Sequence, residues 1–552
     1  MGGGSRIPGC GGADGPEAGV PPAPLDVLSA IAAHARRNPA RAAVSDERRE
    51  LSYGQLLDEA ARTAAGLRAL GVGAGDRVAL LLENGVGFVV AALGCMLAEC
   101  VFTPIAVSDP ERRRAAILAD LEPALVLSEG EPAAGGCPAP SASLAEVLDR
   151  GGADGLATRL AREPVPSRSG SGGEVPCGGA RVAYCVYTSG TTGAPKGVMV
   201  GREAFAFAVA EIARIVGVDE RTRALCVSPV HFDGSFSVIF PTLYRGGLLH
   251  IPRREQLLFP RVYFATLRRR RINCVSFSPS FLRLLRAGGG LSPFAQTDVE
   301  VLALGGEAPT CEEVRRIWQA KPSIRVINRY GPTEATISVS DLVLTPELLD
   351  GGNVPIGAPH AGSGFHLVDA DGRPVSEPGV SAELCVSGRQ LMHGYWRAPE
   401  LTAAALRDDL IPGRLVYRTG DLVRLDGRGL LEFVGRTDRL VKHRGVRVSL
   451  QEVAQRLNGL EGVRACAAVA FDDGGSLGIA AFVVAAAGAA PSASQLLAEL
   501  HDLLPEAMHP DRLFLVPALP LGSSSKLDEA RLLEQVGLTP WAEVAPGAPP
   551  IS

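Results

Sequence analysis

The sequence predicts an α/β protein: a large N-terminal core of mainly parallel sheets flanked by helices, with a small β-rich unit, and a smaller mobile α+β C-terminal domain. Three observations support this. The chain has 552 residues, too many for one ordinary hydrophobic core. Apolar strands alternate with amphipathic helices through its first half, the pattern of a parallel α/β sheet. From about residue 352, short strands alternate with Gly-bearing turns, which is typical of antiparallel β structure.

The elements of the core are expected in a regular order. An amphipathic helix opens at Leu25, and a second helix follows Leu51 with Ser52 as its N-cap. Further strands are expected at 76–82, 125–128, 182–187, 223–227, 273–277, 299–304 and 324–328, and further helices at 86–98, 142–150 and 203–215.

We expect three parts along the chain. Residues 1–24 are rich in Gly and Pro and are expected to be disordered. The core is expected to span 25–437. The mobile domain is expected to span 438–552, where the pattern predicts a compact α+β unit of ordinary domain size.

Composition excludes several classes of function. The formal net charge of −5 provides no general field for nucleic acid. The longest apolar stretch, Gly85–Ala98, is too short to cross a membrane, and the N-terminus lacks the apolar region of a signal peptide. Eleven cysteines include no C-x-x-C pair, which indicates reduced thiols in the cytoplasm and no structural zinc.

One loop dominates the chemistry of the sequence, Tyr187–Gly197. It follows an apolar strand and combines glycines, which let backbone N–H groups approach an anion, with hydroxyls and one lysine. It is no Walker A loop, because that motif needs the lysine directly after its second glycine, and here Ala194-Pro195 separate Gly193 from Lys196. The alternative is a polar surface loop. The ordered run of hydroxyls favours a phosphate cradle formed by Thr188, Ser189, Gly190, Thr191, Thr192, Gly193 and Lys196.

Lysine is rare in this chain. Of 55 Lys and Arg residues only four are lysines, and three lie in stretches that carry other chemical signals: Lys196, Lys442 and Lys526. A compact, flexible ammonium can act where a planar guanidinium cannot. We therefore expect functional roles for these three lysines.

Several loops follow the carboxyl ends of the predicted parallel strands. They are Ser228–Ser235, Ser278-Pro279, Gly305–Ala308 and Arg329–Glu334. Ligands of open α/β sheets bind at this edge, so these loops should meet the phosphate loop in one cleft.

Six motifs in order resemble the adenylate-forming superfamily, in particular the amino-acid adenylation domains of nonribosomal peptide synthetases. They extend over nearly the whole chain and are the phosphate loop, Phe232–Ser235, Asn328–Glu334, Tyr417–Asp421, Gly435–Asp438 and Leu521–Asp528. The resemblance implies a two-step reaction. A carboxylate and Mg·ATP form an acyl-adenylate and pyrophosphate, and a thiol then takes the acyl group.

The resemblance also implies roles for individual residues. Tyr330 would present a flat face to adenine, Asp421 and Arg436 would contact the ribose or phosphates, and Glu334 would bind Mg²⁺. Lys526, in a motif that departs from the usual Asn-Gly-Lys, would be the catalytic cation, brought in by rotation about Asp438. The remaining nucleotide-binding candidates are Gly306, Glu307, Ala308, Asn328, Gly331 and Thr333.

Asp233 indicates the substrate class, because an ammonium-binding carboxylate at this position is expected in enzymes that activate amino acids. Arg329 replaces the small residue usual before the Tyr-Gly-Pro-Thr-Glu run. It could bind a second carboxylate, or it could turn outward to a surface acid. The remaining pocket candidates are Phe232, Gly234, Ser237, Ser276, Ala303, Gly305, Ile337 and Ser338. We expect an acidic amino acid, such as an aspartate or methylaspartate type, with its amine α or β to the reacting carboxylate.

Three hypotheses for the activity follow. Only 26 residues follow Lys526 and contain no Gly-Gly-x-Ser carrier segment, so we expect the aminoacyl group to pass to the phosphopantetheine thiol of a separate carrier protein. In the second hypothesis, coenzyme A is the acceptor. The third is a non-catalytic adenylate binder, which the presence of Lys526 and Glu334 makes improbable.

Overall fold

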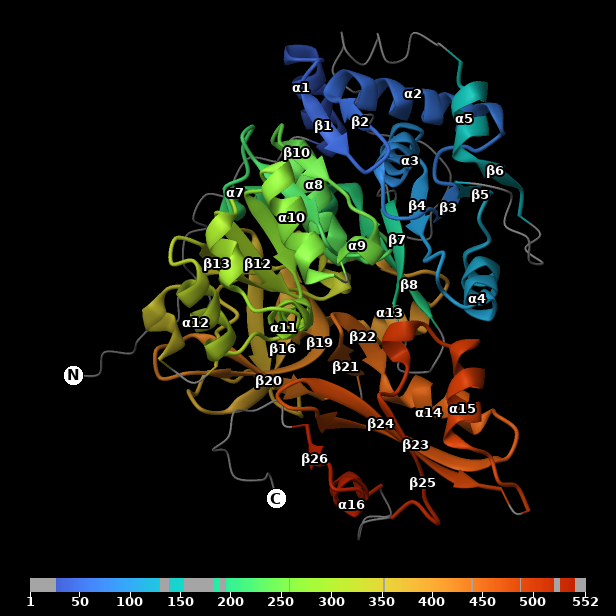
Figure 1. Ribbon diagram of the computed structural model, residues 1–552, viewed down its shortest axis with the longest axis vertical. Helices are drawn as coiled ribbons and strands as arrows, with labels where there is room; N and C mark the ends of the chain where they lie inside the picture. Colours follow the sequence, from blue (N-terminus) through green and yellow to red (C-terminus); the bar gives the residue numbers. More distant parts are fainter. Residues whose placement is uncertain are drawn as a thin grey trace.

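The computed structural model describes residues 26–129, 139–152, 182–188, 195–257, 259–350, 353–437, 440–486, 488–520 and 527–541. It shows an α/β fold, with a large N-terminal core and a smaller C-terminal α+β domain at the bottom of Figure 1. No helix in these ranges has the length and hydropathy needed to cross a membrane.

The largest sheet of the core has eight strands, parallel except for its two outer members. In spatial order they are β14 (Ser340–Val343), β13 (Arg325–Tyr330), β12 (Val301–Gly305), β11 (Cys274–Phe277), β9 (Arg223–Cys226), β10 (Leu248–His250), β1 (Ala42–Ser45) and β2 (Glu50–Ser52). β14 runs antiparallel to β13, which places Arg329 directly opposite Asp341.

A second sheet of seven strands carries the phosphate loop. Its order is β17 (Gly394–Tyr395), β8 (Lys196–Gly201), β7 (Val182–Thr188), β4 (Val101–Pro104), β3 (Arg77–Leu81), β5 (Leu125–Ser128) and β6 (Ser141–Ser143). β7 and β8 pair antiparallel, so the loop joins two adjacent strands and returns Lys196 to a position opposite Thr188.

Helices fill the space between these two sheets. One continuous core contains side chains of both sheets together with those of α1 (Val27–Arg37), α2 (Tyr53–Ala69), α3 (Val86–Leu97), α7 (Arg202–Val216) and α8 (Phe236–Tyr244). Its centre is a cluster of aromatic rings from five elements, α3, β4, β7, α7 and α8. Tyr184 of β7 makes edge contacts with Phe205 of α7 and Phe236 of α8, at centroid distances of 5.3 and 5.1 Å.

Other helices cover the outer faces. α10 (Pro260–Arg270), α11 (Pro279–Ala287) and α12 (Cys311–Ala320) pack on the eight-stranded sheet, and α4 (Glu111–Leu121) packs on the seven-stranded sheet. Three shorter helices also lie in the described part of the core, α5 (Leu144–Arg150), α9 (Arg254–Leu257) and α13 (Pro399–Ala405). The predicted strands and helices of the core are confirmed, with bounds that differ by a few residues. The predicted Ser52 cap is confirmed too, since its side chain accepts from the Gln55 amide.

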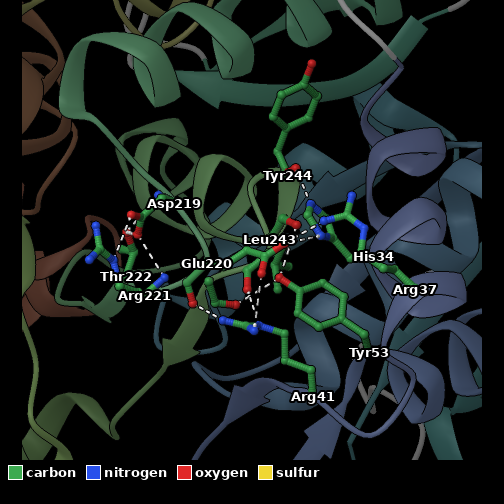
Figure 2. Close-up of polar contacts among 12 residues, drawn as sticks. His34, Arg37, Arg41, Tyr53, Asp219, Glu220, Arg221, Thr222, Leu243 and Tyr244 are labelled. Carbon is green, nitrogen blue, oxygen red and sulfur yellow. Dashed lines mark hydrogen bonds and ion pairs between the residues drawn. The ribbon is translucent and has the colours of Figure 1, made fainter.

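The N-terminal segment is tied to the end of α8 by polar contacts (Figure 2). The buried Tyr53 hydroxyl lies 3.1 and 2.8 Å from the carbonyls of Leu243 and Gly247. His34 meets the Tyr244 carbonyl at 3.1 Å, and Arg37 pairs with Glu220 at 2.6 Å. These contacts join segments about 200 residues apart and close the end of the core opposite the C-terminal domain.

A β-rich unit and the C-terminal domain complete the fold. The unit is an antiparallel sheet of β15 (Ser363–Val368), β16 (Ser381–Gly388), β19 (Arg414–Leu425), β18 (Leu406–Ile411) and β20 (Leu431–Arg436). The C-terminal domain has a hairpin, β21 (Leu440–His443) and β22 (Val446–Ser449), and a sheet of β25 (Arg512–Leu515), β24 (Leu477–Ala485), β23 (Val463–Asp472) and β26 (Thr539–Pro540). Its helices are α14 (Leu450–Asn458), α15 (Ala493–His501) and α16 (Glu529–Gln535). The hairpin, not the sheet, faces the core.

Candidate active site

A cavity of about 640 Å³ lies where the carboxyl ends of the strands of both large sheets meet the hairpin β21–β22. The predicted convergence of these loops is thus observed. Thr188 ends β7, Gly305 and Gly306 follow β12, and Gly331 and Thr333 follow β13, and all of them line the cavity. Residues on both sides of the boundary between core and C-terminal domain contribute to its wall, so the position of the C-terminal domain controls its shape.

Lys196, at the C-terminal end of the phosphate loop, lies beside a buried carboxylate. Lys196 Nζ is 3.1 Å from Glu334 Oε1 and 2.8 Å from the Tyr395 hydroxyl, and it lies 4.1 Å from the centre of the Tyr395 ring. The residues between the ends of this loop, Ser189–Gly193, lie outside the described residues. The loop therefore starts and ends next to a charged network around Glu334.

Glu334 is the most heavily paired carboxylate of the site. Its side chain is fully buried, and it contacts Lys196, Tyr395 and, at 3.0 and 3.1 Å, Arg447 Nη1. Burial would raise the pKa of this carboxyl, but the charges of Arg447 and Lys196 outweigh burial and hold it well below its ordinary value. Glu334 is therefore an ionised oxygen donor.

This donor set can hold Mg²⁺ only in part. In the described residues no three His, Cys, Asp or Glu side chains gather into a metal site. Mg²⁺ is commonly held by one or two carboxylates together with substrate phosphates, so Glu334 is a fitting single ligand. Arg447 already contacts both of its oxygens, and it would have to withdraw for a metal ion to reach them.

The hairpin docks on the turn that follows β12. Gly306, at φ 83°, faces the Gly445 carbonyl, and a Cβ there would lie 3.4 Å from that oxygen. Gly445, at φ 80°, approaches Ser278 at 3.1 Å in the same way and hydrogen-bonds through its backbone to Glu307. Two glycines in the left-handed region thus allow two backbones to meet at the cavity. This contact brings Arg447 onto Glu334.

The proposed adenine and ribose residues form a second buried network. The Tyr330 hydroxyl donates to Asp421 at 2.6 Å, and Arg436 pairs with the other oxygen of Asp421. Lys442 lies over the Tyr330 ring, 5.6 Å from its centre. Sequence alone suggests no such contact, because 112 positions separate the two residues.

Two other nucleotide-binding candidates have structural partners. Asn328 donates to the Pro355 carbonyl at 2.8 Å and is buried. Glu307 accepts from the Ser280 hydroxyl at 2.8 Å and pairs with Arg283 at 3.4 Å. Neither side chain lines the cavity, and the same holds for Ala308. Their predicted contact with nucleotide stays a prediction.

The fold places most of the predicted substrate-pocket residues on the wall of this cavity. The residues that line the cavity are Phe232, Asp233, Gly234, Ser237, Ser276, Gly305, Arg329 and Ile337. Ala303 and Ser338 are buried behind this wall and do not line it. Ser338 instead donates its hydroxyl to Asp341 at 2.9 Å. The tight turn after β13 buries it, because a glycine at 331 lets the chain fold directly onto the Ser338 backbone.

Asp233 carries a buried oxygen, Oδ2, with no hydrogen-bond partner. Burial raises the pKa of this carboxyl to about 6, against hydrogen bonds from Thr333 and Gly234 that lower it. An unpartnered buried carboxylate is costly, and a cationic ligand would satisfy it.

Arg329 is buried and does not turn to a surface acid. Its Nε donates to Asp341 Oδ1 at 2.5 Å, Nη1 lies 3.4 Å from the Ser276 hydroxyl, and Nη2 is buried without a hydrogen-bond partner. Its partner Asp341 is also buried, which excludes the surface-acid alternative. Asp341 therefore holds the guanidinium from behind, and Nη2 is left without a hydrogen-bond partner in a residue that lines the cavity.

Sequence reasoning missed several residues of the site, namely Asp341, His360, Gln390, Tyr395 and Arg447. Asp341 could have been found from strand register, because it pairs directly across from Arg329. Arg447 lies five positions after Lys442 in the same hairpin, which is a weak signal. His360 and Gln390 reach the site from distant loops and Tyr395 from the short strand β17, and no local pattern marks them. Lys526 and Asp438 lie outside the described residues.

Comparison with known proteins identifies the family. Residues 31–396 match the model of the AMP-binding enzyme family. The chain is 34% identical over 522 residues to a linear gramicidin synthase of Brevibacillus parabrevis, covering 93% of this chain and 10% of that protein. It is also 34% identical over 516 residues to phenyloxazoline synthase MbtB of Mycobacterium tuberculosis, covering 92% of this chain and 34% of that protein. The chain therefore spans between about a tenth and a third of the length of these relatives.

Solved structures show the same fold. PA1221, a nonribosomal peptide synthetase protein containing adenylation and PCP domains, superimposes with a TM-score of 0.77 at 26% identity, covering 93% of this chain and 84% of that one. IdnL1 superimposes with a TM-score of 0.74 at 31% identity, covering 91% and 99%. The chain belongs to the AMP-binding enzyme family and is an ATP-using adenylating ligase of the nonribosomal peptide synthetase adenylation-domain type.

Proposed function

We propose that this enzyme activates an acidic amino acid, with one amine and two carboxylates, as an aminoacyl-adenylate. One observation carries the proposal. Two residues of opposite charge that line the cavity, Asp233 and Arg329, each have a buried side-chain atom without a hydrogen-bond partner, Oδ2 and Nη2 respectively. Asp233 would bind the ammonium, and Arg329 would bind the carboxylate that does not react.

The third group of the substrate, the reacting carboxylate, would then point to the phosphate loop. Aspartate, glutamate and methyl-branched relatives fit this arrangement. β-Amino acids fit as well, since the small Gly234 and Gly305 leave room for a short branched skeleton.

The chemical roles follow from the network around the cavity. Thr188, Ser189–Gly193 and Lys196 would hold the phosphates. Tyr330, Asp421 and Arg436 would hold the adenosine. Glu334 would be the protein ligand of Mg²⁺, which neutralises charge on the phosphates when it is bound. Lys526 would bring a mobile cation to the charge that builds up in the transition state.

The second step would pass the aminoacyl group to the phosphopantetheine thiol of a separate carrier protein. PA1221 combines adenylation and PCP domains in one protein. In this chain the cavity continues between core and C-terminal domain, past Arg113, Arg444 and Met508, which is a route for a long thiol arm. The C-terminal domain, residues 438–552, would rotate relative to the core, residues 25–437, about Asp438. We place the enzyme in the cytoplasm. The alternative acceptor is the thiol of coenzyme A, and the thioester-capture test below distinguishes the two acceptors.

The test is pyrophosphate exchange over a panel of amino acids and simple acids. We expect the highest kcat/KM with aspartate-like substrates. Arg329→Ala should lower it by roughly 10²–10³-fold for the diacid, because breaking a buried charge pair costs about 3–5 kcal/mol. Neutral amino acids of similar size should lose little.

Arg316→Ala is the matched control, since this guanidinium pairs with exposed Glu312 on α12, outside the cavity. It should leave all rates near those of the wild type. A wild type that prefers neutral amino acids, or equal losses for both substrate classes in Arg329→Ala, would show that the diacid assignment is wrong. Thioester capture with carrier protein or with coenzyme A then identifies the acceptor.

A further inference from the structure

A buried network of hydrogen bonds lies behind Arg329. Asp341 accepts from Arg329 Nε through Oδ1, and its Oδ2 lies 3.0 Å from His360 Nε2 and 2.9 Å from the Ser338 hydroxyl. His360 Nδ1 is 3.0 Å from Gln390 Oε1. His360 and Gln390 are 3% and 1% exposed, so water cannot replace these partners.

The hydrogen-bond pattern determines the charge of His360. The pKa of Asp341 is below its ordinary value, because the charge of Arg329 and the hydrogen bond from His360 outweigh its burial. The ionised Asp341 can therefore only accept. Gln390 Nε2 donates to the Ser338 carbonyl at 2.5 Å, which leaves Oε1, an acceptor, toward His360. Both imidazole nitrogens thus face acceptors, Asp341 Oδ2 and Gln390 Oε1, an arrangement that a doubly protonated ring with one positive charge satisfies.

The network then has a net positive charge. Arg329 and His360 each contribute +1, and Asp341 contributes −1. Buried charge is costly unless it is paired, and the remaining partner must come from the cavity that Arg329 lines. An anionic group of the substrate, placed at the free edge of Arg329, would supply it.

The same network holds a strained turn of the pocket wall. Thr336 and Ile337 have φ values of 56° and 69°, which β-branched residues rarely adopt. The Gln390 side chain donates to the backbone carbonyls of Thr336 and Ser338. The backbone carbonyl of Gln390 accepts from the Thr336 hydroxyl at 2.6 Å. Gln390 thereby connects the charged network to Ile337, which lines the cavity.

We propose that Asp341 and His360 are positioning residues that determine substrate specificity. Asp341 holds Arg329 at the cavity wall, and the His360 charge leaves the network one anion short. The pocket therefore selects a substrate with an anionic side group. Gln390 fixes the backbone on both sides of Ile337 and so holds this part of the cavity wall beside the charged network. The inference rests on the proposed diacid function.

The test compares kcat and KM for aspartate and for a neutral amino acid of similar size. His360→Gln keeps one donor toward Asp341 but removes the positive charge. We expect KM for aspartate to rise about 10- to 100-fold with little change in kcat, and the values for the neutral substrate to stay within about 3-fold. His366→Gln is the control, because this histidine meets Ser387 at 2.8 Å away from the cavity.

A second measurement does not depend on a variant. In protein labelled with 15N at histidine, both ring nitrogens of His360 should show the chemical shifts of the protonated form. The 15N spectrum also decides the case if His360→Gln does not fold.

The outcomes separate the two proposals. A wild type that prefers neutral substrates would overturn the proposed function. A wild type that prefers aspartate, combined with equal losses for both substrates in His360→Gln, would overturn this inference alone. A ring nitrogen of His360 without a proton would overturn it too.

Discussion

Two arginine–carboxylate pairs each contribute their arginine to the cavity wall, and they differ in what holds them together. Arg329 and Asp341 are 12 positions apart and face each other across neighbouring strands of one sheet. Arg447 and Glu334 are 113 positions apart and join the C-terminal hairpin to the core. The first pair is fixed by strand register. The second persists only while the hairpin stays docked.

An arginine–carboxylate pair therefore serves two different purposes in this molecule. The pocket pair orients a charge toward the substrate and has no reason to separate during the reaction. The hairpin pair covers the carboxylate that we propose as the Mg²⁺ ligand, so it has to break before a metal ion can bind there. Each carboxylate has a second cationic partner, His360 for Asp341 and Lys196 for Glu334. Removing the arginine therefore leaves neither Asp341 nor Glu334 without a partner.

The largest effect is expected from Glu334→Gln. The change leaves Lys196 and Arg447 without their shared anion and removes the proposed metal ligand, so pyrophosphate exchange should fall by more than about 100-fold for every substrate. Asp341→Asn is the matched change in the other pair. It should alter the preference between diacid and neutral substrates but leave the Mg²⁺ dependence of exchange unchanged. If Glu334→Gln exchanges pyrophosphate at a rate within a few-fold of the wild type, Glu334 has no role in adenylation.

A smaller and selective effect is expected from Arg447→Met. The docked hairpin loses a charge-assisted contact worth roughly 1.5–3 kcal/mol, so thioester formation should slow about 10-fold or more. Pyrophosphate exchange should persist and reach half of its maximum at a lower Mg²⁺ concentration, because Arg447 no longer competes for Glu334. Titration of exchange with Mg²⁺ and single-turnover thioester formation measure the two effects.

Arg113→Met is the control for this prediction. Arg113 pairs with buried Glu452 of α14 at 3.0 Å, which is a second contact between core and C-terminal domain, without touching Glu334. It should weaken docking but leave the Mg²⁺ dependence unchanged. Identical Mg²⁺ titrations for Arg447→Met and the wild type would show that the arginine does not compete with the metal ion.

The smallest effect is a gain of stability in Asp233→Asn. Since burial raises the pKa of Asp233 from 3.8 to about 6, the folded protein holds more protons than the unfolded chain between these values. The stability contribution of Asp233 is therefore full below pH 3.8 and is lost as the pH rises through 6. Asp233→Asn should raise stability above pH 6 by at most about 3 kcal/mol, at the expense of amino-acid activation.

Melting temperatures of the wild type and Asp233→Asn at about pH 4 and about pH 8 measure this gain, because these values lie near the two ends of the titration. The difference between the two proteins should grow with pH. A difference that is the same at both pH values would show that the charge of Asp233 carries no burial penalty.

Much of the site could be predicted because its signals are local. Tyr187–Gly197 shows strand, turn and charge in consecutive residues, and the strands that end at Gly305 and Tyr330 are marked by apolar runs followed by turn residues. Asp233 could be placed for the same reason, since its motif lies in the loop that follows β9. Ala303 and Ser338 lie behind the cavity wall because the side on which a residue points depends on turn geometry, which spacing alone does not determine.

By itself, the sequence determined the α/β fold class, the order of the elements and the candidate residues at the ends of the strands, because apolar periodicity and turn chemistry act over a few residues. Only the tertiary structure decided the partners of the charges. Arg329 meets Asp341 through strand pairing, His360 and Gln390 reach Asp341 from remote loops, and Arg447 meets Glu334 by docking of the hairpin. The physical reason is that a buried charge is satisfied by whatever group the fold brings within about 3 Å, whatever its distance along the chain.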